Sequence, residues 1–272
     1  MIRQFLNPPN WFSAASLFCG LYAILLAGGA NGDPNAFYQA GLMIFFAGLF
    51  DGLDGRVARL TGTGSAFGVQ LDSLIDVVSF GVAPAALLYF WGLQPYGMSG
   101  VFVAFFFMLC GAFRLARFNV MTDNKVHTYS PGITITMGGG TLAAMVMWQA
   151  ANGNSAPENA GAVILYTLSI AVLMVSNVPY RTLKTMRRSW RTMVGVVLFA
   201  GAFVALGAVY DISTVIFTIG TIHILSGPVE ALVMFPRRRR ARRAERAAAK
   251  KAELSGRKPD ADRSDDETKT GV

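Results

Sequence analysis

Long apolar stretches recur along most of the sequence and are separated by short polar loops. Eight of them approach the length of about 20 residues that a helix needs to cross the hydrocarbon core of a bilayer. The stretches cover approximately residues 11–28, 36–50, 74–91, 98–113, 133–150, 160–176, 193–209 and 212–235. This pattern predicts an all-α fold, a polytopic membrane helix bundle of about eight transmembrane helices.

Positively charged residues lie on one side of this predicted bundle. Lys and Arg follow the even-numbered stretches, as at Arg59 and Lys125, whereas the loops after the odd-numbered stretches contain none. Because Lys and Arg in short loops favour the cytoplasmic side, we expect both termini to face the cytoplasm. No A-x-A-like cleavage site follows the first stretch, so we expect this helix to be retained.

The overall composition agrees with a membrane protein. Of the 272 residues, 53% are hydrophobic and only 15% are charged, and the mean hydropathy is +0.43. Soluble domains carry about a quarter charged residues, so a soluble globule and a disordered chain are both excluded. The two cysteines, Cys19 and Cys110, lie within apolar stretches and indicate neither a disulfide framework nor a cysteine metal site.

The C-terminal end has a different composition. Residues 237–258 contain 11 Lys or Arg and 2 Glu, and the residues after them are acidic and polar. We therefore predict a membrane-embedded domain over residues 1–236 and a cytoplasmic tail over residues 237–272, partly helical and then disordered. The basic residues would bind anionic membrane lipids or serve only as a positive-inside anchor. Without interleaved aromatic residues, no nucleic-acid partner is expected.

Four acidic residues, Asp51, Asp54, Asp72 and Asp76, fall within 26 positions of this apolar chain. Asp51 and Asp54 are three residues apart, and Asp72 and Asp76 are four apart, so each pair projects from one face of its helix. Carboxylates in membrane helices are costly, and carboxylate oxygens suit hard cations such as Mg²⁺ or Mn²⁺. The cluster favours a site for two divalent ions that handles phosphate; a proton or ion relay in a transporter and solvated helix-end charges remain alternatives.

The residues around this cluster resemble a known signature. The sequence from Asp51 to Asp76 follows the pattern D-x2-D-G-x2-A-R-x8-G-x3-D-x3-D and matches all eight of its fixed positions. This pattern is typical of the CDP-alcohol phosphatidyltransferase family of integral membrane enzymes. The resemblance implies that the membrane domain is catalytic and transfers a phosphatidyl group from CDP-diacylglycerol to an alcohol, releasing CMP.

The resemblance also implies a role for each matching residue. Asp51 and Asp72 would bridge two Mg²⁺ or Mn²⁺ ions, Asp54 would complete one ion site, and Asp76 would complete the other. Asp76 would also be the catalytic base for the attacking hydroxyl. The residues that correspond to the binding site for CDP-diacylglycerol are Asn10, Gly55, Arg59 and Ser65.

Three further segments resemble the branch of the family that uses serine as the acceptor. They are residues 17–20, 80–84 and 110–119. Phosphatidylserine is then the expected product, and the candidate serine-binding residues are Arg114, Arg117 and Asn119. The segment Tyr129-Ser-Pro-Gly-Ile departs from the G-L-P-x-P common in that branch, so glycerol phosphate, inositol and choline remain alternative acceptors. The resemblance further implies a homodimer in a bacterial inner membrane, with the active site facing the cytoplasm.

Overall fold

The computed structural model describes residues 8–62, 65–121, 129–181 and 211–232. The chain divides into two units, Met1–Gly227 and Pro228–Val272. The packing and the site described below belong to the first unit; in the second unit, the described residues 228–232 end a long helix. The predicted helix over residues 193–209 and the predicted domain boundary at residue 236 lie outside the described residues.

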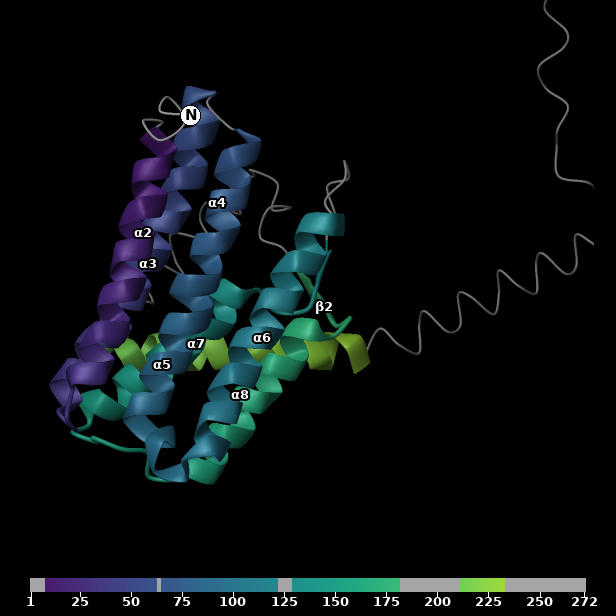
Figure 1. The fold of residues 1–272 in the computed structure, drawn as a ribbon. Helices are drawn as coiled ribbons and strands as arrows, with labels where there is room; N and C mark the ends of the chain where they lie inside the picture. Colours follow the sequence, from purple (N-terminus) through teal and green to yellow (C-terminus); the bar gives the residue numbers. More distant parts are fainter. Residues whose placement is uncertain (1–7, 63–64, 122–128, 182–210, 233–272) are drawn as a thin grey trace, which may run out of the picture. The chain divides into compact units, whose positions relative to one another are not determined.

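Helices make up nearly all of the described chain (Figure 1). The α-helices are α2 (Pro8–Gly29), α3 (Pro34–Thr61), α4 (Ala66–Asp76), α5 (Ala83–Leu88), α6 (Met98–Met121), α7 (Ile135–Ala151), α8 (Ala160–Val175) and the helix Ile212–Leu232. Between α4 and α6 the chain stays helical through π-helical segments Val77–Val82 and Tyr89–Leu93 and a 3₁₀ turn, Gln94–Tyr96.

Five helices of the described chain are long and apolar enough to span a membrane: Pro8–Gly29, Pro34–Thr61, Phe67–Tyr96, Met98–Val120 and Ile212–Leu232. A shorter apolar helix covers Ala160–Val175. The structure thus confirms a helical, multi-pass membrane protein, whereas the predicted number of about eight spans stays a prediction.

Two helices reach further than the apolar pattern predicted. The second predicted stretch ends at residue 50, but α3 continues to Thr61 and ends at Gly62, whose φ of 65° lies in the left-handed region. Hydropathy marks only the membrane-crossing part, and the polar residues after Phe50 are compatible with a helix until this glycine. Similarly, the third helix begins at Ala66, about two turns before the predicted residue 74, because Ser65 caps its first turn.

Small residues bring the helices that carry the acidic cluster close together. Helices α2 and α3 run side by side (Figure 1), and Ala23 and Ala40 are fully buried in their core. A Cβ at Gly20 would lie 2.9 Å from Ser79 Oγ, so α2 touches the π-helical segment Val77–Val82 almost backbone to backbone. Such contacts between small residues are typical of membrane helix packing. They place the start of α2 next to the acidic residues of α3 and α4.

A pair of very short strands is an exception to the predicted all-α fold. Strand β1 (Tyr129–Pro131) pairs antiparallel with β2 (Pro179–Arg181), and Ser130 lies opposite Tyr180. The pairing joins the segment before α7 to the segment after α8. Because each strand is only 3 residues long and its partner lies about 50 positions away, no hydrophobic alternation marks it in the sequence.

Candidate active site

Three of the four predicted acidic residues come together. Asp51 of α3 and Asp72 and Asp76 of α4 each offer a carboxylate oxygen, and these three oxygens all lie within 4.8 Å of one another. Asp72 and Asp76 share one face of α4 because they are four residues apart. The contact between α3 and α4 brings Asp51 to this pair, whereas Asp54, which was expected in the same cluster, lies outside it.

The oxygen atoms of this cluster fit a hard cation. In the described part of the chain, Asp76 Oδ1 is the one buried side-chain oxygen or nitrogen without a hydrogen-bond partner. A buried carboxylate oxygen without a donor is costly, and carboxylates this close repel one another. A divalent cation would satisfy both, and oxygen ligands are those that Mg²⁺ and Mn²⁺ prefer. The residues present thus fit a metal site.

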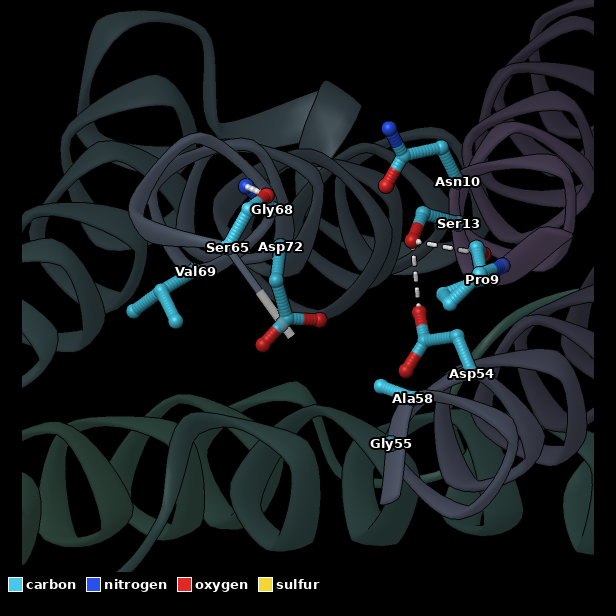
Figure 2. A pocket seen from close by; sticks show the side chains of 10 residues that line it. All are labelled: Pro9, Asn10, Ser13, Asp54, Gly55, Ala58, Ser65, Gly68, Val69 and Asp72. Atoms are coloured by element: carbon cyan, nitrogen blue, oxygen red, sulfur yellow. Dashed lines mark hydrogen bonds between the residues drawn. The ribbon is translucent and has the colours of Figure 1, made fainter. Parts of the chain in front are cut away.

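Asp54 is oriented differently from the other three carboxylates. It lies on α3, is only 7% exposed and accepts a hydrogen bond of 2.7 Å from Ser13 Oγ of α2. Asp54 lies outside the three-carboxylate group; together with Asp72 it lines a pocket (Figure 2). Sequence analysis did not identify Ser13. The available signal was a polar residue three positions after Asn10 in an otherwise apolar helix.

The pocket is built from three segments of chain (Figure 2). Its lining comprises Pro9, Asn10 and Ser13 of α2, Asp54, Gly55 and Ala58 of α3, and Ser65, Gly68, Val69 and Asp72 around α4. Three of the four predicted donor-binding residues, Asn10, Gly55 and Ser65, are among them. The pocket therefore joins residues that are more than 50 positions apart in the sequence.

The first turn of α4 forms one wall of this pocket. Ser65 Oγ accepts a hydrogen bond of 3.0 Å from the Gly68 backbone N–H and so caps the helix. A Cβ at Gly68 would lie 3.7 Å from Asn10 Oδ1, so the absence of a side chain there keeps this wall open. Backbone N–H groups at a helix N-terminus favour negatively charged ligands. The wall is thus suited to a phosphate group.

Arg59, the fourth predicted donor-binding residue, lies beside the pocket and is absent from its lining among the described residues. Its side chain is exposed, and its guanidinium folds back along α3 to within 3.6 Å of where a Cβ at Gly55 would be. A larger residue than glycine at position 55 would contact this guanidinium. The arrangement leaves a cation next to the pocket, available to an anionic ligand.

The three candidate acceptor-binding residues have different surroundings. Arg114 of α6 is only 7% exposed, stacks over the Phe118 ring at 5.2 Å and interacts electrostatically with Asp76. Asn119 Nδ2 donates to Ser73 Oγ at 2.9 Å, beside Asp72 in the chain. Arg114 and Asn119 are therefore both linked to the helix that carries the acidic cluster.

Arg117 is held by four protein acceptors. Its guanidinium donates to the carbonyl oxygens of Val175, Ser176 and Pro131 and to Asn177 Oδ1, at 3.0 to 3.2 Å. The Arg117 side chain thus connects α6 to the end of α8 and to strand β1 through these hydrogen bonds.

Comparisons with known proteins relate this sequence to one family. The sequence model of the family described as CDP-alcohol phosphatidyltransferase matches residues 6–226. A CDP-diacylglycerol--serine O-phosphatidyltransferase of Helicobacter pylori is 36% identical over 195 residues, which cover 70% of this chain and 78% of the relative. An archaetidylserine synthase of Methanothermobacter thermautotrophicus is 34% identical over 181 residues, covering 66% and 71%. A Saccharomyces cerevisiae CDP-diacylglycerol--serine O-phosphatidyltransferase is 44% identical over 122 residues, covering 44% and 43%.

Proposed function

Because this chain belongs to the CDP-alcohol phosphatidyltransferase family, we propose that it transfers the phosphatidyl group of CDP-diacylglycerol to the hydroxyl of serine. The products are phosphatidylserine and CMP. The observation that carries the proposal is the convergence of the Asp51, Asp72 and Asp76 carboxylates beside a pocket that Asp72 also lines. Relatives named for transfer to serine support serine as the acceptor.

The pocket residues bind the cytidine diphosphate part of the donor. The first turn of α4 directs backbone N–H groups toward the diphosphate, and Arg59 adds positive charge beside it. Asn10 offers an amide that hydrogen-bonds polar groups of the nucleotide, and Gly55 leaves room for close approach. The apolar lipid chains then extend into the surrounding membrane.

The residues that would hold two divalent ions, Mg²⁺ or Mn²⁺, are Asp51, Asp54, Asp72 and Asp76. When bound, the ions offset negative charge on the transferring phosphate and on the leaving CMP. The orphan Oδ1 of Asp76 and the mutual approach of three carboxylates support this assignment.

Asp76 acts as the general base for the transfer. Its carboxylate takes the proton of the serine hydroxyl while the serine oxygen forms a bond to the phosphorus that carries the lipid. The bond from this phosphorus to the CMP oxygen breaks, and CMP leaves. Asp76 is the last residue of α4 and directly precedes the π-helical segment Val77–Val82.

Arg114 binds the serine carboxylate. It is a buried cation whose charge interacts with that of Asp76, so a carboxylate bound to it would hold the serine hydroxyl near the base. Asn119, which bonds to Ser73 of α4, contributes to the same region. Arg117 has less support among the three candidates because four protein acceptors already hold its guanidinium.

We further propose that the protein lies in a bacterial inner membrane as a homodimer, with both termini and the active site facing the cytoplasm. The distribution of Lys and Arg over alternate loops supports this orientation. Soluble serine and CMP then exchange on the cytoplasmic side, where the serine pool is found.

The reaction is tested with the purified full-length chain in detergent. CMP release from CDP-diacylglycerol is measured with Mg²⁺ or Mn²⁺ and with serine, glycerol phosphate, inositol or choline as the acceptor. We expect CMP release with serine alone among these alcohols, and its loss when the ions are chelated. Release with another alcohol only would refute serine as the acceptor, and no release with any alcohol would refute the transfer reaction.

Asp76→Asn is the sharpest single variant for this mechanism. The amide keeps the size of the side chain but accepts no proton, so turnover should fall by at least about 100-fold, the usual contribution of a general base. Expression and elution on size exclusion should match the wild type. Activity within a few-fold of wild type would refute the role of Asp76 as base.

A further inference from the structure

We propose that Ser13 is a positioning residue for the candidate metal site, because its hydroxyl fixes the Asp54 carboxylate. Ser13 Oγ of α2 donates to Asp54 Oδ2 of α3 at 2.7 Å across 41 positions of sequence. Both side chains are buried, at 4% and 7% exposure. This inference rests on the proposed function, since it assumes that Asp54 is an ion ligand.

The hydroxyl of Ser13 has two acceptors within reach and one hydrogen. The second acceptor is the Pro9 carbonyl oxygen, four residues earlier in the same helix, at 3.3 Å. A serine inside a helix commonly bonds back to this carbonyl. The bond to Asp54 is shorter by 0.6 Å, as the two distances show, and its acceptor is a carboxylate, which forms the stronger bond. Ser13 therefore donates its hydroxyl hydrogen to Asp54 and not to the Pro9 carbonyl oxygen.

This bond gives the two Asp54 oxygens different surroundings. Oδ2 is turned toward Ser13, and Figure 2 shows the other oxygen directed away from Ser13, into the space across which Asp72 lies. A free aspartate rotates about its terminal torsion, whereas one with a bonded oxygen keeps the other aimed in one direction. The oxygen that Asp54 would offer to an ion is then already in place.

A residue that orients a metal ligand through a hydrogen bond also contributes to the affinity for the ion. Loss of such a hydrogen bond typically weakens ion binding by about 10- to 100-fold. Ser13 also lies three residues after Asn10 on the same face of α2, and both line the pocket. The helix that contacts the donor thus also sets the position of an ion ligand.

The test measures Mn²⁺ binding to the purified full-length chain in detergent by the electron paramagnetic resonance signal of free Mn²⁺. We expect Ser13→Ala to weaken binding of one ion by about 10-fold or more. Ser13→Thr keeps the hydroxyl and should retain most of the affinity. The matched control is Ser16→Ala, since Ser16 is a buried serine one turn further along α2 that contacts Ser79 instead.

Ser13→Ala is also compared in the presence of Asp54→Asn. If Ser13 acts through Asp54, its replacement should cause no further loss of Mn²⁺ affinity in that background. Three results would overturn the inference while leaving the proposed function intact. They are an unchanged Mn²⁺ affinity in Ser13→Ala, an equal loss of affinity in Ser16→Ala, and a full additional loss when Ser13→Ala is added to Asp54→Asn. A wild-type chain that binds no Mn²⁺, or Asp51→Asn binding as well as wild type, would overturn the proposed function and this inference with it.

Discussion

Two arginines of the same helix have different surroundings. Arg114 and Arg117 lie one turn apart on α6, yet the first is buried near the acidic cluster and the second donates to four protein oxygens. Both would satisfy a positive-inside pattern, so the charge alone does not separate them. The partners of Arg117 distinguish it, because four of its five N–H donors already bond to protein oxygens.

The Arg114→Lys variant tests the first of these roles. Lysine keeps the positive charge but loses the planar fork that binds a carboxylate through two hydrogen bonds. We expect the KM for serine to rise about 10-fold, which corresponds to about 1.4 kcal/mol, with an unchanged KM for CDP-diacylglycerol. Steady-state CMP release at varied serine gives the value, and an unchanged serine KM would remove Arg114 from the acceptor site.

At the scale of the elements, glycine and serine determine how near α2 comes to the site. Gly20 lies against Ser79, and the Ser79 hydroxyl donates to the Ser16 carbonyl oxygen at 3.2 Å. Ser79 belongs to the π-helical segment that directly follows Asp76. The contact therefore holds α2, with Asn10 and Ser13, at a fixed distance from the acidic residues.

Gly20→Ala should separate these elements. The added Cβ would lie 3.0 Å from the Ser79 Cα, and since that atom is backbone, the helices themselves must shift. Overpacking of this kind typically costs about 1–3 kcal/mol, so the midpoint of thermal unfolding in detergent should fall, together with the activity. Gly29→Ala is the control, since nothing lies within 4 Å of a Cβ there. Equal stability of the two variants would contradict the proposed role of the contact.

At the scale of the whole described unit, Arg117 joins segments that no sequence pattern connects. Its four acceptors belong to the end of α8, the residues after it and strand β1, about 14 to 60 positions away along the chain. A Cβ at Gly132 would fall on the Leu173 and Met174 carbonyls, and its φ of 74° suits glycine. The start of α7 is thus fixed to the end of α8 from two sides.

Arg117→Lys should affect stability more than substrate binding. Lysine offers three donors in place of five and cannot span the four acceptors, so the midpoint of thermal unfolding should fall. The KM for serine, measured at a temperature where the variant stays folded, should match the wild type. A raised serine KM with unchanged thermal stability would instead identify Arg117 as a serine ligand.

The spacing of residues within a helix predicted part of this arrangement, whereas contacts between residues distant in sequence could not be predicted. The four-residue step from Asp72 to Asp76 and the short link between α3 and α4 favoured a cluster of all four carboxylates, and in the structure Asp51, Asp72 and Asp76 come together while Asp54 lies outside the group. The bond from Ser13 to Asp54 could not be predicted from the sequence, because Ser13 and Ser16 both lie in the apolar helix α2 and nothing in their spacing shows which of them contacts an acidic residue. The separation of Asp54 from the other three carboxylates likewise could not be predicted from the spacing.

The π-helical segment that begins at Val77 has a consequence for the helix on either side of it. A π turn contains more residues than an α turn. The segment Val77–Val82 therefore changes the directions in which the side chains after it project from the helix axis. The carboxylates of α4 and the buried side chains of α5 therefore project in directions that one uninterrupted α-helix would not give them.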